Sequence, residues 1–121
     1  MERSDVSEMS SSDSAPFDYQ RVLIDACLRH RVPFFWRGPG TMLISIKGAS
    51  PVLRDVTARG YPMLGVEGFE LDGTVIHPRL DLIFDAESRP DVSDPVAVLA
   101  GWPDDVWIDV VVGPRAEHKT P

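Results

Sequence analysis

The sequence contains one group of side chains with which a protein could carry out acid–base catalysis. His77, Asp81 and Asp85 recur along a strand-like segment, and a neutral histidine beside a carboxylate is the pair that general-base chemistry uses. His77 and Asp81 are four residues apart, however, which is roughly 13 Å along an extended strand at about 3.3 Å per residue. We therefore predict a solvated, salt-bridged surface and no catalytic residue. The alternative is a small-molecule-binding domain or enzyme, with a pocket between sheet and helices near His77.

The sequence lacks the motifs of metal, thiol and phosphate chemistry. His30, His77 and His118 stand in three separate segments, and the acidic stretches lack the alternating Asp/Asn loop that binds calcium. Cys27 is the single cysteine and falls on the apolar side of a predicted helix, which favours a buried side chain over a reactive thiol. Neither a GxxxxGK[ST] phosphate loop nor a GxSxG nucleophile motif occurs. We expect no metal and no cofactor.

Negative charge gathers in the second half of the chain. Residues 62–112 carry eleven acidic and two basic side chains, whereas residues 16–61 carry three acidic and seven basic ones. An acidic surface repels phosphates and anionic lipids, so we expect neither direct nucleic-acid binding nor membrane binding. It attracts a basic protein, with association rates that fall as salt rises. The basic residues of the first half could also neutralise these acids within the fold, and the sequence leaves that open.

A tryptophan accompanies the acids of the segment 85–105. Protein interfaces are typically anchored by Trp, Tyr or Arg inside a polar rim. Trp102 could serve as such an anchor, although large aromatic side chains also fill cores. The predicted partner-binding residues are Glu87, Asp91, Asp94, Trp102, Asp104 and Asp105.

The first half of the chain predicts two helices and a β-hairpin. An apolar stripe at helical spacing begins near Tyr19 and includes His30. The helix should stop before Val32, because Pro33 disfavours a helical conformation at the preceding residue. "VPFFW" and "TMLISIK" read as two strands joined by a glycine-containing loop. A second helix follows, with Ser50 as its N-cap and Gly60 at its end. Its predicted buried residues are Val52, Leu53 and Val56.

The second half predicts three more strands. Asp72-Gly73 indicates a tight turn in which Leu71 faces Thr74. A short helix should begin at Pro95, and "VWIDVVV" reads as a central, buried last strand. One face of the strand pair would hold Phe69, Ile76, Leu80, Leu82 and Phe84, and the other Glu70, His77, Arg79, Asp81 and Asp85.

These elements predict an α+β fold with a single domain. We expect a mainly antiparallel (mixed) five-stranded sheet with two to three helices packed on one face. Residues 1–15 are too polar to pack and should be disordered, residues 16–112 form the domain, and residues 113–121 form a polar tail. The single cysteine, the lack of a secretory signal and the lack of a membrane-length apolar run predict a cytoplasmic protein.

The leading hypothesis is a small acidic protein that recognises a basic partner protein. In size and charge the chain is similar to bacterial immunity proteins and antitoxins, which block a basic toxin, often a nuclease. The resemblance concerns overall character and no motif carries it. A homodimer is a further alternative, with the "FFW" hairpin or the last strand as its contact.

Overall fold

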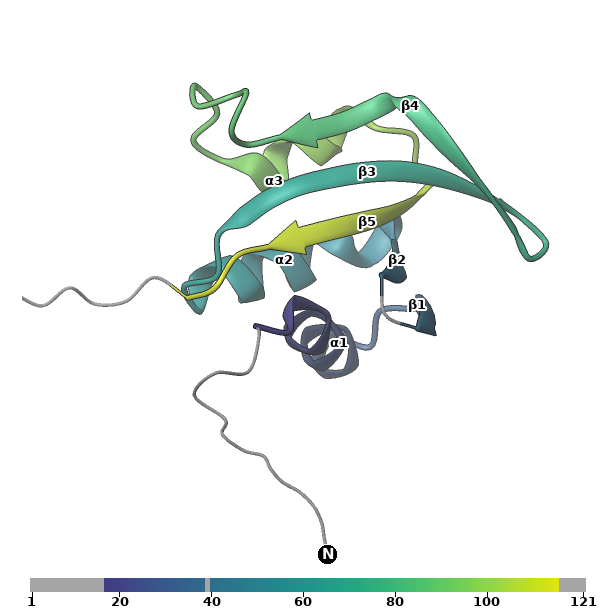
Figure 1. The fold of residues 1–121 in the computed structure, drawn as a ribbon, viewed down its shortest axis with the longest axis horizontal. Coiled ribbons are helices and arrows are strands. Elements are labelled where there is room, and N and C mark those ends of the chain that lie inside the picture. Colours follow the sequence, from purple (N-terminus) through teal and green to yellow (C-terminus); the bar gives the residue numbers. More distant parts are fainter. Residues whose placement is uncertain (1–16, 39, 116–121) are drawn as a thin grey trace, which may run out of the picture.

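The protein forms one antiparallel sheet covered on one side by helices. The computed structural model describes residues 17–38 and 40–115, so the predicted disorder of residues 1–15 and most of the C-terminal tail lie outside the described residues. The strand order is β1-β2-β5-β3-β4. Helices α2 and α3 lie behind the sheet in the view of Figure 1, and α1 packs against α2 beside β5. The α+β prediction is confirmed.

The strands are β1 (Phe34–Gly38), β2 (Thr41–Ser45), β3 (Met63–Asp72), β4 (Val75–Asp85) and β5 (Trp107–Val112). The helices are α1 (Tyr19–His30), α2 (Ala49–Ala58) and α3 (Pro95–Val98), with short 3₁₀ turns η3 (Ile46–Gly48) and η4 (Leu99–Gly101).

Helix α1 begins and ends where its sequence indicates. The side chain of Asp18 caps its N-terminus by accepting a hydrogen bond from the Arg21 backbone N–H at 3.3 Å. Leu23, Ala26 and Cys27 are buried against the sheet and α2. His30 was predicted on the same buried stripe but lies at the helix–helix contact, exposed and bonded to α2.

Helix α2 starts one residue before the predicted cap. Gly48 occupies the N-cap position and Ser50 lies inside the first turn. A glycine is needed at position 48 because an added Cβ would come within 2.9 Å of the Val32 side chain. The buried residues of α2 are the predicted Val52, Leu53 and Val56, together with Ala49.

The β3–β4 hairpin has a different register from the predicted one. Asp72 faces Val75 and Leu71 faces Ile76, so the turn residues are Gly73 and Thr74. Among the described residues of this turn only Gly73 has a positive φ, of 63°. Asp72 therefore remains in the strand, and the turn moves one residue along the chain from the predicted position.

A bulge in β4 divides the hairpin into two parts with opposite alternation. Gly68 pairs with Arg79 and the adjacent Glu67 pairs with Ile83, so residues 80–82 have no partner on β3. Leu82 enters the core beneath Gly68, where an added Cβ would lie 2.8 Å from the Leu82 Cβ. Leu80 is 79% exposed. The predicted faces are therefore wrong, because the bulge changes which side chains of β4 point toward the helices.

The helix-facing side of the sheet holds the main core. Ile44, Ile108, Val66 and Phe84 pair across the strands and are all buried. On the opposite side, Leu43 of β2 is 2% exposed although it alternates with the core residues. By the same alternation, the half-buried apolar side chains on this side include Phe35, Phe69, Leu71, Ile76 and Trp107.

The segment between β4 and β5 crosses from one end of the sheet to the other. Both strands are antiparallel to β3, so they run parallel to each other. The end of β4 at Asp85 and the start of β5 at Trp107 therefore lie at opposite ends of the sheet, joined by a connection that includes α3 (Figure 1). Strand β5 is central, as predicted. None of the helices within the described ranges has the length and apolar character to cross a membrane.

Candidate functional site

A groove of about 290 Å³ lies on the side of the sheet that the helices leave uncovered. Gly65 forms its floor between Asp85 of β4 and Val111 of β5, with which it pairs. Because Gly65 has no side chain, the sheet is hollowed between its neighbours. The residues that line the groove are Gly65, Val66, Glu67, Ile83, Phe84, Asp85, Asp109 and Val111.

Three carboxylates belong to this groove. Glu67 pairs directly with Asp109 on β5, so their side chains are on the same side of the sheet, and Asp85 stands across β3 from Val111. Burial, and then the charge of Glu67, raise the pKa of Asp109 to about 6. Among the described residues, none of the three carboxylates has an Arg, Lys or His nitrogen within 4.0 Å.

Apolar side chains surround these acids. Ile83 is 51% exposed and Val111 is 39% exposed, and both line the groove. Leu64 is also exposed, and its side chain lies close to Gly113 at the end of β5. Single exposed apolar residues are ordinary, but Ile83 and Val111 line a groove whose carboxylates have no cation partner among the described residues, so its surface is both apolar and anionic.

Most cations of the first half of the chain do not neutralise the acids of the second half. Among the ion pairs of the described residues, Arg54 to Asp94 at 2.9 Å is the single one that joins the two halves. Arg79 and Arg89 pair with acids of their own half. Seven acids of residues 62–112 are thus without an ion-pair partner in the described structure: Glu67, Asp72, Asp85, Glu87, Asp104, Asp105 and Asp109.

The predicted partner-binding residues do not come together on one surface. Glu87 is exposed and its backbone N–H donates to Asp85 at 3.1 Å, so it lies beside the groove. Asp91 and Asp94 are paired with Arg89 and Arg54, which lower the pKa of each carboxyl. The other three belong to the opposite end of the sheet, because they precede β5: the partly buried Trp102, which packs against the core, and the exposed Asp104 and Asp105.

The predicted acid–base group is also divided. His77 is opposite Glu70, on the side of the hairpin that continues the helix-facing side, whereas Asp85 is on the groove side. Arg79 donates to Asp81 at 2.9 and 3.0 Å and to Glu70 at 2.9 Å, as expected for a salt-bridged surface. His77 lines neither the groove nor the smaller hollow on the helix side of the molecule.

Metal and thiol chemistry find no support in the described residues. Across residues 17–38 and 40–115, no three His, Cys, Asp or Glu side chains are grouped so that they could hold a metal ion. Cys27 is fully buried, and burial raises the pKa of its thiol to about 11. A thiol of this kind is mostly protonated at neutral pH and is a poor nucleophile.

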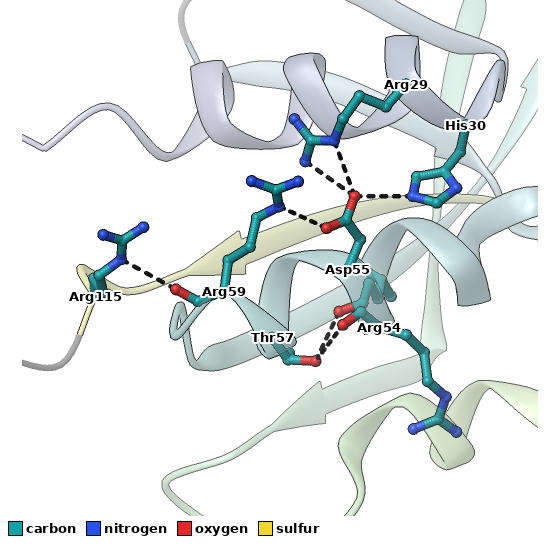
Figure 2. Close-up of polar contacts among 8 residues, drawn as sticks. Arg29, His30, Arg54, Asp55, Thr57, Arg59 and Arg115 are labelled. Atoms are coloured by element: carbon teal, nitrogen blue, oxygen red, sulfur yellow. Dashed lines mark hydrogen bonds and ion pairs between the residues drawn. The ribbon is translucent and has the colours of Figure 1, made fainter.

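A second polar cluster joins the two long helices. Asp55 of α2 accepts hydrogen bonds from Arg29 Nε at 3.0 Å, Arg59 Nε at 2.6 Å and His30 Nε2 at 2.8 Å (Figure 2). Its side chain is 16% exposed. These contacts, with that to Arg59 the largest, hold the pKa of the Asp55 carboxyl well below its usual range. The cluster connects α1 to α2.

One feature of the sequence could have indicated the groove, although it matches no known motif. Asp109 is the single charged residue of the strand Trp107–Val112, and a carboxylate in a central strand must face either the core or an uncovered side. Glu67 and Gly65 alternate in the same way on β3. These residues lie together because β3 is between β5 and β4 in the sheet. This strand order could not be predicted from local sequence patterns.

Comparisons of the chain with protein-family models, with curated proteins and with solved structures found no match.

Proposed function

We propose that the protein binds a basic partner protein through the uncovered side of its sheet, at the groove of Glu67, Asp85 and Asp109. The observation that carries the proposal is a half-buried carboxylate, Asp109, facing a second carboxylate with no cation beside either in the described structure. Such an arrangement costs stability in the isolated chain, and a cation from a partner would remove that cost.

The size and lining of the groove favour basic side chains as its occupants. Its volume is at the lower limit of typical small-molecule sites, which are roughly 300–1,000 Å³ and more enclosed. An Arg or Lys side chain can lay its aliphatic part on Val111 and Ile83 while its charged end reaches Asp109. Glu87 at the rim adds long-range attraction, which increases the rate of encounter.

The finer form of the proposal is an immunity protein or antitoxin that neutralises a basic toxin. A strongly acidic small chain with a binding face of this kind suits the occlusion of a cationic active site, such as that of a nuclease, because the carboxylates can take the place of phosphates. A cytoplasmic location belongs to the same proposal, supported by the single buried cysteine.

Affinity capture with charge-matched baits tests the proposal. The wild-type chain, Glu67→Gln/Asp85→Asn and Asp104→Asn/Asp105→Asn would each be used to capture proteins from lysate of the source cells at low and moderate salt. The last two baits lose the same charge, one in the groove and one at the other end of the sheet. We expect a basic protein that the wild type and the Asp104/Asp105 variant retain and the groove variant loses.

The captured protein would then be purified and its affinity measured directly. Loss of two carboxylates at a partly buried contact should weaken binding at least tenfold, equivalent to about 1.4 kcal/mol. If the Asp104/Asp105 bait alone lost the partner, binding would be at the opposite end of the sheet. Equal retention by all three baits would show that these acids do not determine binding, and the proposal would fail.

A further inference from the structure

The helix side of the molecule contains a second hollow whose charge is opposite to that of the groove. It has a volume of about 130 Å³, and three of its residues are arginines. These come from three separate segments: Arg29 from α1, Arg59 from the end of α2, and Arg115 from the chain after β5. The complete lining is Val22, Asp25, Arg29, Arg59, Tyr61 and Arg115.

Each guanidinium group is held in place through its Nε atom. Arg29 and Arg59 donate from Nε to Asp55, and Arg115 donates from Nε to the Arg59 carbonyl oxygen at 3.0 Å (Figure 2). Arg115 also lies over the Tyr61 ring, with its Cζ 5.3 Å from the ring centre. The terminal nitrogens of Arg59 and Arg115 make no hydrogen bond within the described residues. Held side chains lose little entropy when they bind a ligand.

The local charge favours an anion despite two nearby carboxylates. Asp25 lines the hollow and is paired with Arg21 at 4.0 Å, and Asp55 is shared by Arg29 and Arg59. Counting Arg21 and Arg115, four guanidinium groups stand against two carboxylates, which leaves a net charge of +2. A doubly charged oxyanion would balance it.

We propose that this hollow is a binding site for a phosphate-type oxyanion, held by Arg59 and Arg115 with Arg29 at its edge. The planar fork of guanidinium donors matches the oxygens of a phosphate group. The volume of about 130 Å³ leaves room for one such group. The proposal is independent of partner binding at the groove, which lies on the other side of the sheet.

Phosphate titration followed by NMR tests the proposal on the full chain. Inorganic phosphate would be added at constant ionic strength, with chloride as the control, while the arginine Nε–Hε and backbone signals are recorded. We expect saturable shifts confined to Arg29, Arg59, Tyr61, Arg115 and their neighbours. Shifts equal to those given by chloride, or spread over the surface, would overturn the proposal.

Two variants of equal charge make the result specific. Arg115→Gln should weaken phosphate binding about tenfold, while Arg89→Gln, which removes a cation from the far loop, should leave it unchanged. Arg115→Lys should bind with intermediate affinity, because it keeps the charge and loses the fork. Unfolding temperatures would confirm that each variant is folded. Equal binding by wild type and Arg115→Gln would contradict the assignment.

The acidic N-terminal residues are the competing occupant. Phe17, the first described residue, stacks on Tyr61 of the hollow with ring centres 5.8 Å apart. A full-length variant with Glu2→Gln, Asp5→Asn, Glu8→Gln and Asp13→Asn separates the two cases. Phosphate binding to both chains supports an external ligand. Binding only to the neutralised chain would assign the hollow to the segment and overturn the proposal, as would binding to neither.

Discussion

Two aspartates on opposite sides of the molecule have opposite surroundings. Asp55, between the helices, accepts hydrogen bonds from two arginines and a histidine, and these lower its pKa. Asp109, on the uncovered side of the sheet, faces Glu67 and apolar side chains, and its pKa is raised to about 6. The first carboxylate is paired with cations, and the second has no cation partner among the described residues.

This difference distinguishes a carboxylate that stabilises the fold, Asp55, from one that is a candidate for binding a partner, Asp109. Proteins usually pair or solvate their carboxylates, and departures from that rule are concentrated at functional sites. The Asp55 cluster shows that this chain can supply cations where a carboxylate needs them. Their absence around Asp109, within the described residues, therefore favours a cation that comes from another molecule.

The largest predicted effect is the loss of the Asp55 cluster. Asp55→Ala should lower the free energy of unfolding by about 2 kcal/mol, because charge-assisted hydrogen bonds are lost and the guanidinium groups of Arg29 and Arg59 remain close together. For a domain of this size the midpoint of thermal unfolding should fall by about 5–10 °C. Calorimetry at pH 7 measures the effect.

Asp25→Asn is the control for this prediction. Asp25 pairs with Arg21 at 4.0 Å on the exposed surface of α1, and such pairs contribute less than about 0.5 kcal/mol. The difference between wild type and Asp55→Ala should also shrink in acid. A lowered pKa means that the stabilisation is present above the ordinary Asp pKa near 4 and is lost as the carboxylate becomes protonated at lower pH. A constant difference from pH 7 to pH 2 would contradict the ion-pair explanation.

Asp109→Asn should raise the free energy of unfolding, in contrast to Asp55→Ala. A pKa of about 6 in the folded state, against about 3.9 in the unfolded chain, corresponds to at most about 3 kcal/mol, and the open side of the groove reduces this to about 1–2 kcal/mol. The variant should therefore be more stable than wild type at pH 7–8. Because the folded state binds the proton more tightly, wild type should regain stability as the pH falls from about 7 to 4, and the difference should vanish near pH 4.

The same substitution should weaken binding of the basic partner. In our proposal the Asp109 carboxylate lowers the stability of the free chain but contacts a cation in the complex. Its replacement should therefore raise stability and lower affinity for the partner. Wild-type affinity should also fall as the pH drops below about 6, because Asp109 takes up a proton there. An Asp109→Asn chain that is less stable than wild type at pH 8 would show that the carboxylate has a partner within the fold.

Gly65→Ala tests whether the shape of the groove matters apart from its charge. An added Cβ at position 65 would meet only the Phe84 carbonyl oxygen, at 3.4 Å, which is ordinary contact. Stability should change by less than about 1 kcal/mol, in either direction. Partner affinity should fall several-fold, because the methyl group fills the floor of the groove. Leu80→Ala, at an exposed site away from the groove, is the control. Gly73→Ala is not suitable, because the φ of 63° at position 73 would strain an alanine. Equal affinity of wild type and Gly65→Ala would place the contact elsewhere.

Local patterns predicted the elements of this fold better than their arrangement. The helix that begins near Tyr19, the buried stripe of α2 and the central last strand follow from side-chain periodicity and backbone preferences, which act over a few residues. The bulge at residues 80–82 does not, because it depends on Leu82 fitting beneath Gly68 of another strand. The bulge reverses the alternation of side chains along β4. His77 and Asp85 therefore lie on opposite faces of the sheet.

The candidate site was harder to predict for the same reason. The charge excess of residues 62–112 was visible in the sequence, but adjacency along the chain was a poor guide to adjacency in space. Glu87 and Asp104 belong to one acidic segment, yet the crossover between the parallel strands β4 and β5 carries them to opposite ends of the sheet. Asp109 and Glu67 are 42 positions apart in the chain and are direct neighbours.

The smallest predicted effect concerns the acids at the far end. Asp104→Asn/Asp105→Asn should leave stability within about 0.5 kcal/mol of wild type, because both side chains are exposed and have no ion-pair partner among the described residues. If the groove is the interface, these acids act only through the long-range field. Their loss should slow association of the partner a few-fold at low salt, and the effect should disappear near 0.15 M salt, where the screening length is about 8 Å. Stopped-flow association rates at two salt concentrations measure this. A faster dissociation of the variant would instead mean that Asp104 or Asp105 touches the partner, and the distinction between the two ends of the sheet would then be lost.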